Sequence, residues 1–523
     1  MNTDIQHNTF SETNQRFPWI DMSPTVLHAA PQVGLVNSIN SSTRILINDE
    51  CLRTLATRLA YGLTGAAQLQ TPPQILLESQ AGAQARASDI ELRLSTPDTG
   101  DVAIPVHGAD ETYRIDVTQP IRVTAQNPGA MARALTTLHK AARVSTVLDP
   151  AVIIDAPAYA ERSVMIDMGR RQFGPEWIIC LLQEMAWNQL NTLHLHLTDN
   201  EGVRVIFPSH PDISSDDAWS AADLKRVLDT AADYHIEVIP ELDMPGHMDW
   251  ILRDKPQWQL KLNNGSVVSK AIDFSIAPAR NFLKSLFTDL MEMFPQSRYI
   301  HLGADEYFLQ PITPDNTPQL AQYVRDETGN LEADSEDAVR YFINSLAELV
   351  QEKGKIARIW NDSAVKRRQV IALKKQVQIE CWSIWGSRRG ELNAQELVDA
   401  GYTVLNAHGD FYFIINKAWD NLFHAKHSPH GIYDVWRANH FMDNAGASFT
   451  EIPSRHPAMA GAGVQLWIEV PTFSSPEEMW TQFRSWLLPL GQRTWDSPNA
   501  ANRFKELPLI ALAVANPPPV PWQ

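Results

Sequence analysis

Strand-like and helix-like segments alternate from residue 163 to residue 490, and this alternation restricts the fold more than any other feature of the sequence. The strand-like segments read SVMIDMG, TLHLHLTD, IEVIPELD, YIHLGADE, KIARIWND, VQIECWS, YTVLNAHG and GVQLWIEV. Neighbouring parallel strands need a long crossover, usually a helix, to join them. The repeated units therefore predict an α/β fold, the (β/α)8 TIM barrel.

A smaller module precedes the predicted barrel. Its segments TRILI, QILLES, IELRLS, YRIDVT and IRVTAQN resemble strands, and ECLRTLATRLAYGL and PGAMARALTTLHKAARV resemble helices. Alternation of apolar and polar residues is typical of an antiparallel sheet with one exposed face. We predict an α+β domain with an antiparallel sheet over residues 21–157 and the barrel over 158–495. Residues 1–20 are expected to be flexible, VLDPAVIIDAPAYAERS to be the linker, and 496–523 to form a proline-rich tail.

Charge and composition exclude several classes of partner. The formal net charge of -17 argues against binding to nucleic acid or to an anionic membrane, because both require basic surfaces. No run of ~18 apolar residues is present, so no segment is expected to span a membrane. The N-terminus MNTDIQHNTF lacks a signal peptide, which makes a cytoplasmic location the expectation, or a secreted one if a leader had been removed.

The cysteines indicate neither a metal site nor a disulfide framework. Cys51, Cys180 and Cys381 lie far apart and match no metal-ligand spacing. We expect them to be buried thiols in a reducing compartment. No cofactor is indicated by the sequence.

Acidic residues recur where the predicted barrel strands end. They are Asp167, Asp199, Glu241, Asp243, Asp305, Glu306, Asp362 and Glu469. Polar strand ends also arise simply where strands meet solvent. In a (β/α)8 barrel, however, the active site lies at the carboxyl ends of the strands, so these acids together indicate a site at one barrel mouth.

Tryptophans lie beside these acids in the sequence, at Trp360, Trp382, Trp385 and Trp467. Flat apolar rings stack on the C–H faces of a sugar, while carboxylates bind its hydroxyl groups. A single tryptophan would more simply be a packing residue of the barrel. Four of them near the acids favour glycoside hydrolysis as the reaction class.

The adjacent acids Asp305 and Glu306 narrow the reaction further. Consecutive strand residues point to opposite faces, so both can reach one site only if the strand ends there and the backbone turns. Ordinary retaining glycosidases place two carboxyl groups on separate segments, whereas substrate-assisted enzymes are an exception. A 2-acetamido group that attacks the anomeric carbon needs one acid for the leaving oxygen and a neighbouring carboxylate for its own N–H.

Several motifs resemble family 20 of the glycoside hydrolases, the β-N-acetylhexosaminidases. HLGADE is similar to the family's His-x-Gly-x-Asp-Glu signature, and ERSVMIDMGRRQF and NTLHLHLTDNEGVR resemble its first two strands. IEVIPELDMPGH, ARIWND, ECWS and GVQLWIE follow in the family's order. The resemblance implies a (β/α)8 barrel that cleaves terminal β-linked N-acetylhexosamine from oligosaccharides or glycoconjugates with retention, through an oxazolinium intermediate.

The resemblance also implies roles for individual residues. Glu306 would be the general acid/base, and Asp305 would orient and polarise the acetamido group. The other implied substrate-binding residues are Arg170, Asp199, His247, Trp360, Trp382, Tyr412, Trp467 and Glu469. Of these, Tyr412 would donate to the acetamido oxygen, the tryptophans would wall the pocket, Arg170 and Glu469 would hold the hydroxyls at C3 and C4, and Asp199 with His247 would support the acid.

Alternatives remain for three of these positions. Arg170 adjoins Arg171, and only one of the two can face inward, so Arg170 could instead be a salt-bridge partner at the strand end. His247 follows Pro245 and Gly246, so it could simply cap a turn. Tyr402 and Tyr433 compete with Tyr412 for the acetamido oxygen, and His301 is interpreted as a packing residue inside the barrel.

The sequence departs from the family pattern at two places. Many members carry Asp-Asp-Gln-x-Trp after the second strand, whereas residues 199–203 read DNEGV. An acid is common two residues after the acetamido-binding tyrosine, and here it is Ile414. We hypothesise that the loss of a polar contact and a bulky wall admits a substituted N-acetylhexosamine, so that a disaccharide is released, as by lacto-N-biosidases.

Three other readings stay open. His194 and His196 resemble the His-x-His metal pair of the metal-dependent amidohydrolases, which also use this barrel. Glu241 and Glu306 would serve as nucleophile and acid in a direct-displacement glycosidase. A sugar-binding barrel without activity is the third. The sequence does not distinguish gluco from galacto substrates, nor does it give the oligomeric state.

Overall fold

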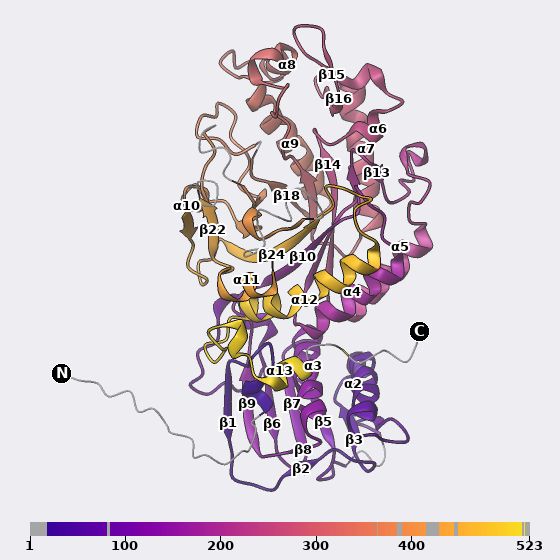
Figure 1. Ribbon diagram of the computed structural model, residues 1–523, viewed down its shortest axis with the longest axis vertical. Coiled ribbons are helices and arrows are strands. Elements are labelled where there is room, and N and C mark those ends of the chain that lie inside the picture. The colour runs from indigo at the N-terminus through magenta and orange to yellow at the C-terminus, as the bar shows by residue number, and fades with distance from the viewer. Residues whose placement is uncertain are drawn as a thin grey trace, which may run out of the picture.

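The computed structural model describes residues 18–80, 84–362, 364–383, 390–414, 428–443, 448–514 and 517. Two separate sheets organise this part of the chain. Figure 1 shows the barrel as the larger upper body and the N-terminal sheet below it. Each body has its own hydrophobic core.

The predicted barrel is confirmed. Its parallel strands are β10 (Glu161–Asp167), β11 (Thr192–His196), β14 (Glu237–Met244), β17 (Tyr299–Gly303), β18 (Ile356–Trp360), β19 (Gln378–Cys381), β20 (Val404–Asn406) and β24 (Met459–Trp467). Pairing of β10 with β24 closes the sheet, and a short strand, β21 (Phe413–Ile414), adds to the far end of β24. The carboxyl ends of all these strands therefore surround one opening.

Helices cover the outside of the barrel. They include α4 (Pro175–Trp187), α5 (Ala221–Asp233), α7 (Ala277–Met293), α8 (Pro318–Thr328), α9 (Ser335–Glu352), α10 (Ala394–Asp399), α11 (Pro429–Asp434) and α12 (Pro476–Trp495). Local signals fix where they begin: Ser220 caps α5 and Asp334 caps α9, each through a reciprocal bond with an aspartate three residues later. Their apolar faces pack on the strands and form the main core.

Loop insertions decorate the carboxyl ends of the strands. They include the hairpins β12 (Thr198–Asp199) with β13 (Gly202–Val203) and β15 (Gln259–Lys261) with β16 (Val267–Ile272), and the short helix α6 (Asp249–Leu252); a further hairpin, β22 (His440–Asp443) with β23 (Ser448–Glu451), lies in the connection from α11 to β24. None of them follows the barrel's strand-helix rhythm, so that rhythm did not predict them. Functional side chains often lie on loops of this kind, which the rigid barrel holds in place.

The sheet of the N-terminal domain is mixed, not antiparallel as predicted. Its order is β1 (His28–Pro31), β9 (Ala151–Asp155), β6 (Tyr113–Val117), β7 (Ile121–Ala125), β5 (Ile90–Leu94), β3 (Arg44–Ile47) and β4 (Gln74–Leu77). β3, β4, β5 and β7 run parallel, and only the pairs on the β1 side are antiparallel. For β3 and β4 the physical reason is α2 (Arg53–Ala66), a helical crossover that brings the chain back parallel to β3.

Two further expectations for the ends and joints of the domains are corrected. VLDPAVIIDAPAYAERS is not a free linker, because β8 (Val147–Leu148) pairs with β2 (Asn37–Ser38) and β9 joins the sheet. Trp19, in α1 (Pro18–Asp21), is 1% exposed in the N-terminal core, so residues 18–20 belong to the fold. Residues 1–17 lie outside the described part.

The tail packs on both domains as far as residue 514. Trp495, at the end of α12, lies in the N-terminal core and donates a hydrogen bond to Asp155. After α13 (Leu509–Ala513), the carbonyl of Val514 accepts a hydrogen bond from Trp187 of α4. The last apolar residues of the described chain thus help α3 (Pro128–Val144) and α4 to join the two domains.

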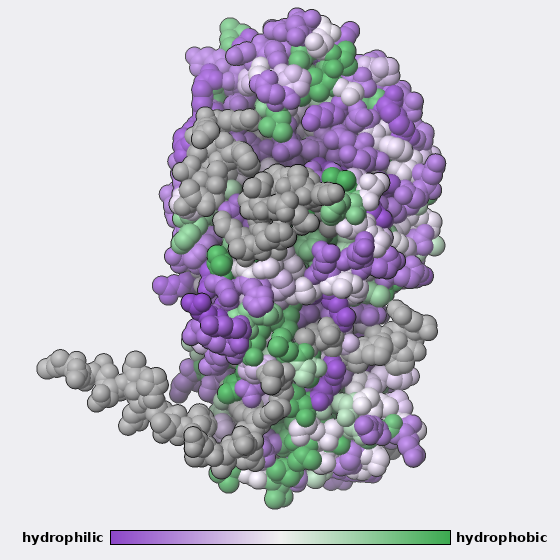
Figure 2. Space-filling view, in the orientation of Figure 1, coloured by the Kyte–Doolittle hydropathy of each residue, from purple (hydrophilic) through white to green (hydrophobic). Residues whose placement is uncertain are grey.

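The surface of the two domains differs in hydropathy (Figure 2). Figure 2 shows a largely hydrophilic barrel face, with hydrophobic residues gathered over the N-terminal domain and its junction with the barrel. The prediction of buried thiols is confirmed for Cys381 and wrong for Cys51, which is exposed beside the first turn of α2, and for Cys180, which is only half-buried. In the described residues, no helix combines the length and the apolar character needed to cross a membrane.

Candidate active site

The backbone turns sharply where β17 ends. This turn explains how the consecutive residues Asp305 and Glu306 can both face one site. Gly303, Ala304 and Glu306 have φ angles of 69°, 74° and 52°. Positive φ is costly for a residue with a Cβ atom and is concentrated at functional sites. The turn rotates the chain between Asp305 and Glu306, so both side chains reach the same place.

His247 is the shared neighbour of the two acids. Its Nε2 lies 3.7 Å from Asp305 Oδ2 and 3.5 Å from Glu306 Oε2, and its Nδ1 lies 3.1 Å from Asp199 Oδ1. The side chain of Asp305 is 11% exposed, whereas that of Glu306 is 35% exposed. His247 therefore does more than cap a turn: it joins three carboxylates at one site.

Burial and neighbouring charges shift the pKa values of Asp305 and Glu306 in opposite directions. Burial raises the pKa of Asp305 to about 7 against the opposing charge of His247, and the charges of Asp362 and Glu306 add to the rise. Burial alone would also raise the pKa of Glu306, but its contact with His247 brings that pKa below the ordinary value. Because both carboxyl groups face His247, they titrate as a pair, which holds one shared proton at mildly acidic pH and loses it as the pH rises through about 7.

The buried Asp305 carboxyl group should make stability depend on pH. Because its folded pKa, about 7, lies above the ~3.9 of an unfolded aspartate, the folded state holds its proton longer. Its contribution to stability is present below pH ~4 and is lost as the pH rises through 7. Asp305→Asn avoids this loss, so we expect a Tm roughly 2–4 °C above wild type at pH 8 and a much smaller gain at pH 4.5.

Thermal denaturation at the two pH values checks this expectation. Glu352→Gln, at an exposed acid at the end of α9, is the control for removal of any one carboxylate. An equal Tm difference between wild type and Asp305→Asn at both pH values would contradict it.

Arg170 faces the site, and Arg171 does not. The Arg170 guanidinium lies 2.9 Å from Asp167 and 3.0 Å from Asp199, with Glu469 at 4.0 Å. Arg171 instead donates to the backbone carbonyl of Ser474. Arg170 and the half-exposed Glu469 together present charged hydrogen-bonding groups to the mouth of the barrel.

Four aromatic side chains form one cluster that contacts Asp362, and we call this cluster the aromatic pocket: Trp360, Trp382, Tyr412 and Trp467. The Trp382 and Tyr412 rings stack with centroids 6.2 Å apart, and Trp467 lies 6.1 Å from Tyr412 and 5.9 Å from Trp360. The competing tyrosines are elsewhere, because Tyr402 donates to the carbonyl of Leu373 and Tyr433 to that of Ala501. Trp385 lies outside the described residues.

Asp362 is a site residue to which the family resemblance assigned no role. One carboxylate oxygen accepts the backbone N–H of Glu306 at 2.7 Å, and the other accepts Nε1–H of Trp382 at 3.0 Å. The same side chain thus ties the acid to the wall of the aromatic pocket. Its position at the end of the fifth barrel strand was the available signal, because all the strand-end acids point to one opening.

The two departures from the family pattern lie in different places. Val203 is fully buried in the barrel core, so it neither walls nor opens the pocket. Ile414 packs against the aromatic pocket, on β21 beside Trp467. Only the change at Ile414 alters the lining of the site.

Two cavities differ in the residues that line them. A cavity of about 200 Å³ adjoins Glu306 and Asp362 and extends to Phe308, Glu336 and Lys366. A larger one, about 750 Å³, lies between α2, α3 and α4, and none of the candidate site residues lines it. Of these two cavities, only the smaller one is lined by candidate site residues.

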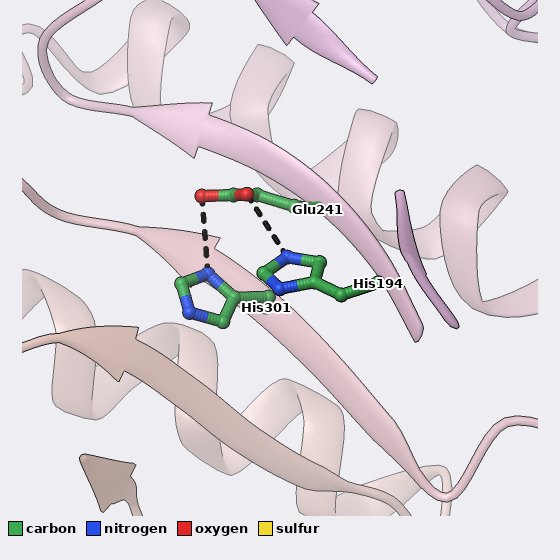
Figure 3. Close-up of side chains that lie close together, drawn as sticks. All are labelled: His194, Glu241 and His301. Atoms are coloured by element: carbon green, nitrogen blue, oxygen red, sulfur yellow. Dashed lines mark ion pairs between the residues drawn. The ribbon is translucent and has the colours of Figure 1, made fainter. Parts of the chain in front are cut away.

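Histidines and carboxylates fill the interior of the barrel below this pocket. Candidate metal ligands lie within 4.8 Å of one another in four groups of described residues: His194, Glu241 and His301; Asp167, His196 and Asp199; His196, Glu241 and Asp243; Asp243, His247 and Asp305. Figure 3 shows the first group, with both histidines pointing at Glu241 from neighbouring strands.

The contacts of Glu241 argue against a metal at its carboxylate. One oxygen accepts from His196 at 2.7 Å and the other from Trp360 Nε1–H at 2.7 Å. A metal ion would have to displace these short bonds in a space that is closed to water. His301, fully buried, is the packing residue that the sequence indicated.

Removal of metal ions should therefore leave activity unchanged. We expect incubation with EDTA followed by gel filtration to leave the rate of glycoside hydrolysis as it was. A parallel sample that receives Zn²⁺ after the same treatment is the control. Loss of the rate with EDTA and its recovery with Zn²⁺ would instead favour the amidohydrolase reading.

Comparison with known proteins places this geometry in a family. Residues 159–497 match the model described as glycosyl hydrolase family 20, catalytic domain. Lacto-N-biosidase of Bifidobacterium bifidum is 28% identical over 355 residues, which are 66% of this chain and 29% of that protein. The beta-hexosaminidase subunit beta of Homo sapiens is 24% identical over 364 residues, covering 66% of this chain and 62% of that one. The chain thus spans less than two thirds of the length of either relative.

Solved structures of similar fold include the beta-N-acetylhexosaminidases of Bacteroides fragilis and Streptomyces coelicolor. The first aligns with a TM-score of 0.72 at 22% identity, over 94% of each chain. The second has a TM-score of 0.70 at 20% identity, over 97% of this chain and 99% of that one. Because the family model matches along the whole barrel, this chain belongs to glycosyl hydrolase family 20.

Proposed function

We propose that the protein is a retaining exo-glycosidase that removes terminal β-linked N-acetylhexosamine by substrate-assisted catalysis. One observation carries the proposal: the turn at residues 303–306 brings two consecutive carboxyl groups to the same histidine, beside an aromatic pocket. Family membership supports the same reaction class.

In the first step, the 2-acetamido oxygen attacks the anomeric carbon and the glycosidic C–O bond breaks. Asp305 accepts the acetamido N–H, which favours its ionised form, so the shared proton is available on Glu306 for the leaving oxygen. In this proposal the aromatic pocket of Trp360, Trp382 and Trp467 encloses the acetamido methyl, and the Tyr412 hydroxyl donates to the acetamido oxygen. The step yields an oxazolinium ion and a neutral alcohol.

In the second step, water opens the oxazolinium ring. Glu306, now ionised, takes a proton from the water as its oxygen attacks the anomeric carbon, and the acetamido group is restored. Two inversions at one carbon give net retention. No protein nucleophile is needed, which fits the position of Glu241: it is fully buried and engaged by His196 and Trp360.

Hydrolysis of p-nitrophenyl glycosides tests the proposal. We expect release of p-nitrophenol from the β-N-acetylglucosaminide or β-N-acetylgalactosaminide and none from the β-glucoside, which lacks the internal nucleophile. Turnover of the glucoside at a comparable rate would show a protein nucleophile instead. No turnover of any glycoside would favour the sugar-binding reading.

A second candidate is release of a disaccharide such as lacto-N-biose. Ile414 at the pocket and the similarity to a lacto-N-biosidase favour it. The p-nitrophenyl lacto-N-bioside should then be cleaved faster than the monosaccharide glycoside, and Ile414→Asp should reverse that order. Absence of disaccharide release would remove this candidate and leave the first one standing.

A further inference from the structure

Glu241 is a buried carboxylate for which the proposed reaction gives no role. It lies on β14 inside the barrel and is 0% exposed. His194 and His301 point at it in Figure 3, and His196 and Trp360 hold its two oxygens. A buried charge costs free energy unless it is paired. The groups that pair with Glu241 therefore indicate what its carboxylate does in the folded protein.

A continuous series of contacts leads from Glu241 to the acid. Glu241 Oε2 lies 2.7 Å from His196 Nδ1, and His196 Nε2 lies 3.1 Å from Asp199 Oδ2. Asp199 Oδ1 lies 3.1 Å from His247 Nδ1, whose Nε2 is 3.5 Å from Glu306. The other oxygen of Glu241 holds Trp360, which forms part of the aromatic pocket.

His196 is the central link, and its surroundings favour the doubly protonated ring. Each of its nitrogens faces a carboxylate oxygen, so each must donate a proton for both bonds to form. Burial would lower the pKa of His196, but the charge of Glu241 and the bonds to Asp199 and Glu241 raise it well above the ordinary value, and Asp167 adds to this. Burial would raise the pKa of Glu241, yet the charge of His196 holds it well below.

We propose that Glu241 and His196 are positioning residues that hold Asp199 and His247 in place beside Glu306. Through its other oxygen, Glu241 also links this series of contacts to Trp360 of the aromatic pocket. This inference rests on the proposed function for its role in catalysis. Neither residue touches the substrate. They act by holding the two histidine rings in an orientation in which every ring nitrogen faces a carboxylate.

The dependence of the rate on the leaving group separates positioning of the acid from a purely structural role. 2,4-Dinitrophenol leaves without a proton, whereas methanol needs one from Glu306. For Glu241→Gln we expect kcat with the methyl β-N-acetylhexosaminide to fall about 30–100-fold and kcat with the dinitrophenyl glycoside to fall less than about threefold. His196→Gln should follow the same pattern.

Glu161→Gln is the matched control. Glu161 is also buried, on β10, and pairs with Arg358 at 2.7 Å, at the opposite end of the barrel from the acids. Its loss tests the general cost of removing a barrel carboxylate and should affect both glycosides alike. Equal losses with both leaving groups in Glu241→Gln would overturn the proposal.

A measurement on the unmodified protein keeps the proposal testable if the variants do not fold or if the enzyme proves to have another substrate. In ¹⁵N spectra of histidine-labelled wild type, His196, assigned with His196→Gln or by ring couplings, should remain doubly protonated at pH 8. A singly protonated His196 at pH 7 would overturn the proposal, whatever the substrate is. Failure of the proposed function alone would appear as a silent wild type with an intact His196 signal.

Discussion

Glu306→Gln should lower kcat/KM for an unactivated N-acetylhexosaminide by about 10³–10⁴-fold, the largest effect that we expect from a single substitution in the site. The glutamine amide keeps the size of the side chain but cannot give a proton to the leaving oxygen or take one from water. Because Glu306 is one-third exposed and its backbone N–H is held by Asp362, the fold should be unaffected.

The leaving group again provides the decisive comparison for Glu306→Gln. With a dinitrophenyl leaving group the first step needs no proton, so the intermediate should form quickly and then accumulate because its hydrolysis lacks the base. A burst of dinitrophenol followed by a slow steady rate is the expected trace. Added azide should accelerate the slow phase and give a β-glycosyl azide. Equal loss for all leaving groups, without a burst, would contradict the role of acid and base.

Asp305→Asn should lower kcat for acetamido substrates by about 10²–10³-fold, the second largest effect. Positive charge develops on the acetamido nitrogen as its oxygen attacks, and an ionised Asp305 stabilises that charge in a site largely closed to water. Asparagine can accept the N–H but brings no charge. The first step should therefore become slow even with dinitrophenol, which distinguishes this variant from Glu306→Gln.

Two measurements together test the assignment of Asp305. The variant should lose activity while gaining thermal stability at pH 8, because a buried carboxylate that serves the transition state is costly in the free protein. Glu201→Gln, at an acid 3.9 Å from Arg170 and away from the pair, should change kcat much less. A nearly silent Asp305→Asn would refute the substrate-assisted mechanism.

The order of the barrel was determined by the sequence itself. Buried parallel strands are short and rich in apolar residues, helices show a longer period, and their alternation is a local property that needs no tertiary information. Strand-end acids could be assigned to one mouth because the barrel places all its carboxyl ends together. Local pattern failed for the N-terminal sheet. Residues 147–157 contain two prolines, which are typical of a linker, yet they supply two strands, because pairing with distant strands overrides local propensity.

The assembly of the site was decided only by the tertiary structure. No local pattern shows that Ala304 and Glu306 adopt positive φ, that Arg170 and not Arg171 turns inward, or that Tyr412 faces the tryptophans while Tyr402 and Tyr433 bond elsewhere. Nor does it show the series of contacts from Glu241 through His196 to Glu306. These features depend on side chains from strands far apart in the sequence that meet only when β10 pairs with β24 and closes the barrel. The sequence therefore determined which groups are available, and closure of the barrel determined which of them touch.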